Sequence, residues 1–160
     1  MARAYLGLGS NVGDKSAMLR EALRRLDEAA GVKVVSCSGF YRTPPWGKTD
    51  QDWFLNAAAA VETDLAPHDL LEVCLSVERS LGRVRDEKWG PRLIDIDVLV
   101  YDGRHVADET LTLPHPHLAE RAFVLVPLAE IAPNLKIGES SIAEALARVD
   151  RGGIERVNDL

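Results

Sequence analysis

Short apolar runs that end at turn-forming residues occur along most of the chain. The runs at 3–8, 32–41 and 94–101 are rich in apolar and β-branched residues, and each predicts a strand. The segment 53–63 is ambiguous, because four consecutive alanines favour a helix, while its short length and the proline at 67 favour a strand followed by a new helix. From the residues alone we favour a strand there.

Amphipathic stretches separate these runs. Apolar residues recur at helical spacing within 19–26, and Asp14, which precedes them, is a candidate N-cap. A second stretch with this spacing is 70–81, and Gly82 follows it directly. A glycine in that place commonly ends a helix, because it adopts a positive φ at no steric cost. Both stretches therefore predict helices that bury one face.

The last third of the chain predicts further helices. They are expected near 118–122 and 125–131, and Ser141 with Glu144 has the spacing of a capping box for a final helix. The element order is then β-α-β, β-α-β and a helical tail. It is typical of an α+β fold, a ferredoxin-like sandwich with an antiparallel sheet and additional C-terminal helices. No linker or repeat interrupts residues 1–160, which are expected to form a single domain.

Composition then limits the classes of function. Hydrophobic residues make up 46% of the chain, as in ordinary soluble domains, and no apolar stretch approaches the roughly 20 residues that cross a bilayer. The net charge of −6 argues against a nucleic-acid binder, although the basic segment 83–92 leaves a phosphate-bearing ligand open. Cys37 and Cys74 lack metal-type spacing and are expected to be buried, reduced thiols. Because a strand pattern, not a leader, follows Met1, we expect a cytoplasmic protein.

Two acids on one strand form the most informative motif, at the end of Trp89-Gly-Pro-Arg-Leu-Ile-Asp95-Ile-Asp97. Side chains two apart on a strand share a face, with Cα atoms about 7 Å apart, so Asp95 and Asp97 are predicted to lie side by side. The other face would carry the core residues Ile94, Ile96, Val98 and Val100. Paired carboxylates suit magnesium, and two ions about 4 Å apart can bridge such a pair and a polyphosphate. The alternative is a solvated strand end, and this short motif alone does not choose between the two.

Cations precede these acids in a segment that a glycine and a proline make a loop. They are Arg83, Arg85, Lys88 and Arg92. Arginine forks match phosphate oxygens, and metal-binding acids beside phosphate-binding cations are the arrangement of phosphoryl transfer. The alternative is a solvated loop whose cations only offset the nearby acids.

Three further features have more than one interpretation. The segment Gly7-Leu-Gly9-Ser-Asn-Val-Gly13 fits neither a dinucleotide fingerprint nor a Walker loop, so a tight strand-to-helix turn is predicted. Asn56 lies in an apolar strand and needs partners, which the edge of a heterocycle can supply. Phe54 and Phe123 are also typical of a core, and His115 between two prolines is typical of polar surface.

Taken in order, five blocks of the sequence resemble the 6-hydroxymethyl-7,8-dihydropterin pyrophosphokinases of folate biosynthesis, over nearly the whole chain. The blocks are 9–13, 40–45, 54–57, 82–85 with 88–97, and 114–115 with 121–123. The resemblance implies transfer of pyrophosphate from ATP to 6-hydroxymethyl-7,8-dihydropterin, which gives AMP and the pterin diphosphate. It also implies a ferredoxin-like fold with extra helices, and a strand at 53–63.

The resemblance further implies a role for each matched position. Asp95 and Asp97 would bind two magnesium ions, and two catalytic residues, Arg83 and Arg92, would neutralise charge. The pterin would contact backbone groups of Thr43, Pro45 and Trp46. The amide of Asn56 would bind its edge, and the rings of Phe54 and Phe123 would lie on its two faces. ATP, the co-substrate, would be bound by Glu78, Arg83, Trp89, Arg92, Ile96, His115 and Arg121. The expected partners are therefore small molecules, with no nucleic acid and no membrane, and the expected state is a monomer.

Two other functions fit parts of the sequence. A sugar-nucleotide transferase also holds a metal-bound diphosphate with two acids two residues apart, but its nucleotide domain is usually larger than this chain. A non-catalytic ligand-binding domain can use the same sandwich, since a fold does not fix a function. That interpretation gives no common use to Asp95, Asp97 and Arg92. Magnesium-dependent consumption of ATP in the presence of hydroxymethyl-dihydropterin would separate the three functions.

Overall fold

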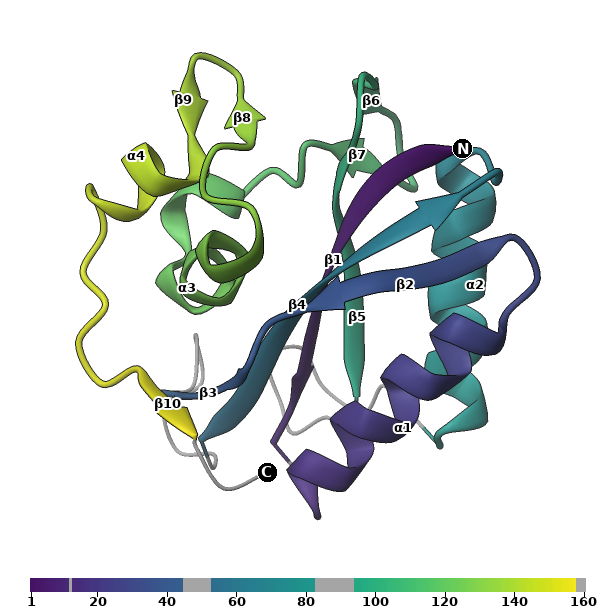
Figure 1. The fold of residues 1–160 in the computed structure, drawn as a ribbon, viewed down its shortest axis with the longest axis horizontal. Helices are drawn as coiled ribbons and strands as arrows, with labels where there is room; N and C mark the ends of the chain where they lie inside the picture. Colours follow the sequence, from purple (N-terminus) through teal and green to yellow (C-terminus); the bar gives the residue numbers. More distant parts are fainter. Residues whose placement is uncertain (12, 45–52, 83–93, 158–160) are drawn as a thin grey trace.

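The computed structural model of the chain describes all residues except 12, 45–52, 83–93 and 158–160. Its largest element is a six-stranded antiparallel sheet (Figure 1). The strands are β1 (Ala2–Ser10), β2 (Val32–Cys37), β3 (Phe40–Thr43), β4 (Phe54–Thr63), β5 (Asp95–Tyr101) and β10 (Glu155–Val157). Their order is β10-β3-β4-β1-β5, and β2 pairs with the end of β4 that β3 does not reach.

Two helices connect the strands in the predicted order. Helix α1 (Lys15–Glu28) joins β1 to β2, and α2 (Pro67–Ser80) joins β4 to β5. The side chain of Asp14 caps α1 by accepting a hydrogen bond from the amide of Ala17 at 3.1 Å. Gly82, with a φ of +87°, donates its amide to the carbonyl of Arg79 at 3.1 Å where α2 ends. Both predicted helices and the ferredoxin-like order are confirmed.

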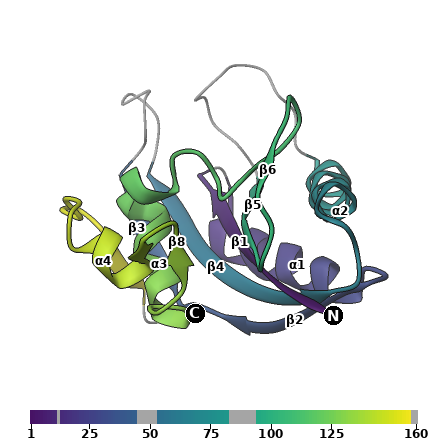
Figure 2. The ribbon, with the colours of Figure 1, turned by 90° about the horizontal axis from the view of Figure 1, so that it is seen from above.

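The sheet separates two apolar clusters. Helices α1 and α2 pack on one face, where the fully buried side chains include Leu6, Leu8, Leu19, Leu26, Val61 and Leu70. Helices α3 (Ala122–Ile131) and α4 (Ile142–Leu146) belong to the second cluster, with Ala58, Leu99, Leu118, Leu125, Leu128 and Ile142. In Figures 1 and 2 the α3–α4 group lies at one side of the molecule and α1 with α2 at the other. The tail therefore adds helices away from the first two, as expected.

The segment 53–63 is a strand in spite of its four alanines. As β4 it lies in the interior of the sheet, paired with β1 on one side and with β2 and β3 on the other. Its alanines face both clusters in alternation, with Ala57 and Ala59 toward α1 and α2 and Ala58 toward α3. Small side chains let helices pack on both faces, so tertiary packing overrides the helix propensity of alanine.

Several predicted boundaries differ from the structure. The single strand expected at 32–41 is two strands, β2 and β3, separated at Ser38 and Gly39, although both pair with β4. The helices expected near 118–122 and 125–131 are a 3-10 turn, η1 (Leu118–Glu120), followed by α3. Ser141 does cap α4 in a complete capping box. Cys74 is buried as expected, but Cys37 is exposed, because it lies where β2 has no neighbour on its outer edge.

A bulge in β5 corrects the predicted core face of this strand. Leu6 pairs with Val98 and Tyr5 pairs with Val100, so Leu99 is an extra residue in β5. An extra residue shifts the alternation of the side chains beyond it. Ile94, Ile96 and Val98 pack in the cluster of α1 and α2 as predicted, whereas Val100 packs in the α3 cluster.

Small hairpins complete the fold. The pair β6 (Val106–Ala107) and β7 (Thr112–Leu113) follows β5, and β8 (Lys136–Ile137) pairs with β9 (Ser140–Ser141). The sequence pattern did not predict these short strands or β10. Among the described residues, no helix is both long enough and apolar enough to span a membrane.

Candidate active site

Asp95 and Asp97 lie at the start of β5, opposite two glycines of the neighbouring strand. The register pairs Asp95 with Gly9 and Asp97 with Gly7. Glycine has no side chain, so at Gly9 the amide of Asn56, and at Gly7 the side chain of Leu99, lie against the β1 backbone. Gly7 and Gly9 belong to β1 and are not part of the strand-to-helix turn predicted for 7–13; within that segment a positive φ, +71°, occurs at Gly13. Both acids line two adjoining pockets, one on each side of them.

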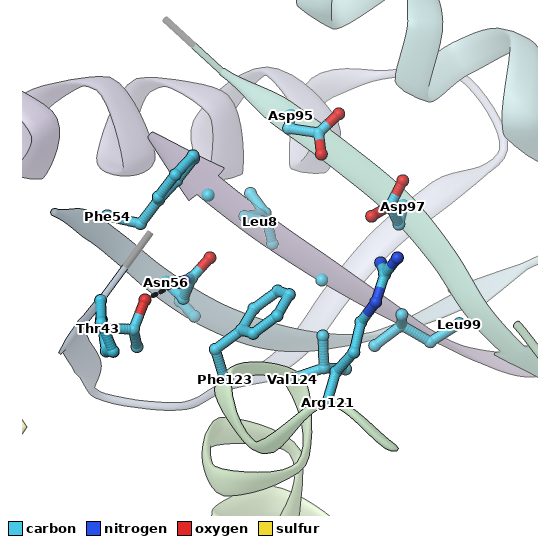
Figure 3. Close-up of a pocket in the computed structure, with 14 residues that line it drawn as sticks. Leu8, Thr43, Phe54, Asn56, Asp95, Asp97, Leu99, Arg121, Phe123 and Val124 are labelled. Carbon is cyan, nitrogen blue, oxygen red and sulfur yellow. Dashed lines mark hydrogen bonds between the residues drawn. The ribbon is translucent and has the colours of Figure 1, made fainter. Parts of the chain in front are cut away.

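The first pocket lies between β4, β5 and the first turn of α3 (Figure 3). It encloses about 780 Å³ of empty space, which includes open solvent. Its apolar wall is formed by Phe54, Leu99, Phe123 and Val124, and its polar groups come from Thr43, Asn56, Asp95, Asp97 and Arg121.

Phe54 and Phe123 form opposite walls of this pocket (Figure 3). Both rings are only partly buried, and neither belongs to the two apolar clusters formed by the described residues. The core interpretation of these phenylalanines therefore does not hold. A flat heterocycle between the two rings would have an aromatic face on each side.

Asn56 is held in a fixed orientation at the floor of the pocket. Its side chain is buried, and its Nδ2 donates a hydrogen bond to the hydroxyl of Thr43 at 2.6 Å. Gly9 lies directly across the ladder, and a Cβ atom there would overlap the amide oxygen of Asn56. The sequence identified Asn56 as a polar residue that needs partners, and its observed partner is the Thr43 side chain. Thr43 was expected to act through its backbone groups, so its hydroxyl has a use that was not predicted.

The second pocket lies on the other side of the carboxylates, between α2, β5 and the β6–β7 hairpin. Three residues expected at the nucleotide line it, namely Glu78, Ile96 and His115. It also contains residues of the hairpin that sequence reasoning missed, Asp108, Glu109, Thr110, Leu111 and Thr112. The hairpin strands are only two residues long, so no alternating pattern in the sequence could reveal them.

Glu78 links α2 to the strand that carries the two acids. Its side chain is only 2% exposed, and its Oε2 accepts a hydrogen bond from the backbone amide of Ile96 at 2.6 Å. Ile96 lies between Asp95 and Asp97 in β5. Glu78 thus fixes the backbone from which both carboxylates project.

His115 is a neutral ring at physiological pH. Burial, the nearby Arg121 and His117 lower the pKa of its imidazole to about 4, and Asp95 offsets only part of this effect. The Nδ1 atom accepts a hydrogen bond from the amide of His117 at 3.4 Å, so the proton of the neutral ring is on Nε2. The His115 ring is therefore a partly buried, neutral imidazole and not the polar surface group that its sequence context suggested.

Arg121 is placed beside the first pocket, although the resemblance assigned it to the nucleotide. Its guanidinium carbon lies 5.8 Å from the centroid of the Phe123 ring, and its side chain points toward Asp97 (Figure 3). Five expected site residues lie outside the described residues: Pro45, Trp46, Arg83, Trp89 and Arg92. Gly7 and Gly9, which border the carboxylates, were missed as site residues, although their spacing of two on a strand was a usable signal.

The donor set suits a hard cation that a ligand helps to hold. Among the described residues, no group of three or more His, Cys, Asp or Glu side chains is arranged to hold a metal ion. Asp95 and Asp97 would then supply one carboxylate each, with the remaining oxygens from substrate and water. Magnesium is usually bound in this way, through one or two carboxylates and substrate phosphates.

Fold and pockets together define a small ferredoxin-like α+β domain with two adjoining small-molecule pockets and a carboxylate pair between them. A sequence model of the 7,8-dihydro-6-hydroxymethylpterin-pyrophosphokinase (HPPK) family matches residues 5–133. The chain belongs to this family.

Curated relatives agree with this assignment over nearly their whole length. A Methylorubrum extorquens protein named 2-amino-4-hydroxy-6-hydroxymethyldihydropteridine pyrophosphokinase is 66% identical over 157 residues, which cover 98% of this chain and 99% of that protein. A Bacillus subtilis protein of the same name is 42% identical, over 94% of this chain and 87% of its own length.

Solved structures confirm the fold. A crystal structure described as HPPK-DHPS in complex with substrates superposes with a TM-score of 0.71 at 15% identity, over 91% of this chain. Plasmodium falciparum HPPK-DHPS with pteroate gives 0.73 at 16% identity, over 92% of this chain. The chain spans 43% and 42% of the length of those two chains.

Proposed function

We propose that the chain transfers a pyrophosphoryl group from ATP to 6-hydroxymethyl-7,8-dihydropterin, giving AMP and the pterin diphosphate in folate biosynthesis. One observation carries this proposal: Asp95 and Asp97 line both pockets at once. A reaction between two bound substrates needs a shared boundary where the reacting atoms meet, and positioning supplies much of the rate enhancement. Family membership and the names of the relatives support the same activity.

The first pocket is proposed to bind the pterin. Its ring system would lie between Phe54 and Phe123, and the amide of Asn56, fixed by Thr43, would read its edge. The ring carries hydrogen-bond donors and acceptors along one edge, which a single amide can satisfy only if its orientation is fixed. The hydroxymethyl group would then point toward the carboxylates.

The second pocket is proposed to bind ATP. Ile96 supplies apolar surface, Glu78 holds the β5 backbone in place, and the neutral His115 presents an Nε2–H donor to a phosphate oxygen. Arg121, near Asp97, supplies positive charge at the boundary of the pockets. Arg83 and Arg92 are proposed to add further positive charge during the transfer, and Pro45, Trp46 and Trp89 to complete the two ligand sites.

Asp95 and Asp97 are proposed to hold two magnesium ions. Bound magnesium would neutralise charge on the phosphate oxygens. In the proposed step, the hydroxymethyl oxygen forms a bond to the β-phosphorus of ATP, and the bond from that phosphorus to the α–β bridging oxygen breaks. The hydroxyl proton passes to solvent, and AMP leaves with the bridging oxygen, which keeps the electron pair of the broken bond.

The products test the proposal. A complete reaction with ATP, magnesium and hydroxymethyl-dihydropterin should yield AMP and pterin diphosphate in equal amounts, as followed by phosphorus NMR. ADP with a pterin monophosphate would overturn the assignment, and no consumption of ATP would favour a non-catalytic binding domain. The expected monomer and cytoplasmic location are part of the proposal, and light scattering of the purified chain tests the first of them.

A further inference from the structure

Glu130, near the end of α3, receives hydrogen bonds from three residues in two other segments of the chain. The hydroxyl of Tyr41 in β3 donates to it at 2.6 Å, and the amide of Gly39 donates at 3.1 Å. The guanidinium of Arg156 in β10 lies 3.5 Å from the same carboxylate. One side chain thus joins α3, the start of β3 and the last strand of the sheet.

These contacts favour the ionised form of the Glu130 side chain. Partial burial opposes ionisation of Glu130. The hydrogen bonds from Tyr41 and Gly39, and to a smaller extent the hydrogen bond and charge of Arg156, nevertheless hold the pKa of this carboxyl below its usual value. An ionised acceptor makes stronger hydrogen bonds than a neutral one. Gly39 contributes by having no side chain, because a Cβ atom there would overlap the guanidinium of Arg156.

Glu130 lies on the same side of α3 as Phe123. The two are seven residues apart, which is two helical turns and about 10 Å along the axis. Strand β3 runs beside this side of the helix. Tyr41 contacts Glu130, and Thr43, two residues further along the strand, lines the pocket together with Phe123. Tyr41 and Thr43 share a face of β3, so one hydroxyl binds α3 and the other binds Asn56.

We propose that Glu130 is a positioning residue for the first pocket: by holding α3 against β3 and β10, it fixes the distance between Phe123 and Phe54. This inference rests on the proposed function, because it assumes that a flat heterocycle binds between the two rings. The family match ends at residue 133, so Arg156 and β10 lie beyond the matched part of the chain. The inference therefore gives β10, which lies outside residues 5–133, a role in substrate binding.

Tyr41→Phe and Glu130→Ala test the role by removing the contact from either side. We expect the dissociation constant and the KM for hydroxymethyl-dihydropterin to rise at least about five-fold, the lower end of typical coupling between sites. The KM for ATP and the kcat at saturating pterin should stay unchanged. Glu130→Gln should recover most of the binding, because its amide oxygen still accepts from Tyr41 and Gly39. Calorimetry in the presence of an unreactive ATP analogue and magnesium measures the binding.

Two comparisons separate positioning from a general loss of stability. Glu62→Ala removes a carboxylate of similar exposure that pairs with Arg3 at 2.9 Å at the far end of β1 and β4, and it should leave pterin binding unchanged. In a Phe123→Ala background, Tyr41→Phe should weaken pterin binding no further, since residues that act through one another are not additive.

The inference is wrong if the Tyr41 and Glu130 variants bind the pterin as tightly as the wild type. It is also wrong if both substrates weaken equally, or if Tyr41→Phe still weakens binding without the Phe123 ring. Should Glu130→Ala fail to fold, Tyr41→Phe and Arg156→Ala decide the matter. A wild-type chain that neither binds nor turns over the pterin contradicts the proposed function itself, which is a separate result.

Discussion

At the scale of single residues, side-chain alternation on a strand predicted the most informative feature of the site. Asp95 and Asp97 do share a face, because the bulge in β5 occurs beyond them at Leu99. What the alternation could not give is their surroundings. The two glycines opposite them come from a strand more than 80 residues earlier in the chain, and the β1–β5 register that places them is a tertiary property.

Replacing either acid should abolish most of the turnover. Asp95→Ala and Asp97→Ala remove oxygens proposed to hold magnesium, and we expect kcat to fall by about 100-fold or more, the scale for losing one charge-stabilising group. Steady-state kinetics at saturating magnesium measure the effect, and circular dichroism checks the fold. Asp102→Ala, at the exposed turn just after β5, is the matched control and should be fully active. Near-normal activity of a variant that lacks both acids would refute their role.

Asn56→Ala should weaken binding of the pterin while nucleotide binding stays the same. The amide is proposed to bind the ring edge, and its loss leaves donors and acceptors of the ligand unpaired at about 1–3 kcal/mol. Titration calorimetry with each ligand separately gives the comparison. Thr43→Val should have a smaller effect in the same direction, because it removes only the hydrogen bond at 2.6 Å that orients the amide. Equal weakening of both ligands would indicate a folding defect.

At the scale of secondary-structure elements, local signals located the helices better than the strands. Asp14, Gly82 and Ser141 act at helix ends through contacts within a few residues, so the sequence could identify them. Strand β4 was ambiguous because alanine favours helices, and only its two neighbours in the sheet decide its conformation. Strand β10 has three residues and pairs with β3 across more than 100 positions, so no local pattern predicts it.

Ser141→Ala should destabilise α4 without affecting catalysis. The Ser141 hydroxyl accepts from the amide of Glu144 at 3.1 Å, and the Glu144 carboxylate accepts from the amide of Ser141 at 2.8 Å. Loss of such a cap costs about 1 kcal/mol of unfolding free energy. Urea denaturation measures it, with the exposed Glu139→Ala as the control. A variant as stable as the wild type would mean that the capping box contributes nothing to the free energy of unfolding.

At the scale of the whole molecule, the sheet has a helical layer on each face, and the candidate site lies where the second layer meets the sheet. Ferredoxin-like order was predictable, because short loops and the alternation of strand and helix leave few topologies. The contribution of α3 to the pocket was predictable only from the resemblance. No periodicity shows that the turn at Arg121 and Phe123 packs beside β4 and β5.

The stability of the whole chain should fall in mild acid through His115. Its pKa in the folded state is about 4, below the usual 6.5, so between these values the unfolded chain binds more protons. The folded state is therefore destabilised as the pH drops from 6.5 toward 4, by about 1–2 kcal/mol once the solvent-exposed part of the ring is discounted. Urea unfolding from pH 7 to 4.5 should show a smaller loss in His115→Gln than in the wild type.

If the wild type and His115→Gln lose stability in parallel, the imidazole is not the group that titrates.

The pairing of β10 with β3 has a consequence for the order in which the protein forms during translation. Residues 40–43 leave the ribosome more than 100 residues before their partner at 155–157, so the outer edge of β3 has no strand beside it while the rest of the sheet is made. An unpaired edge can pair with another nascent chain. Arg156 can reach Glu130 only long after Gly39 and Tyr41, the other two donors to this carboxylate, have left the ribosome.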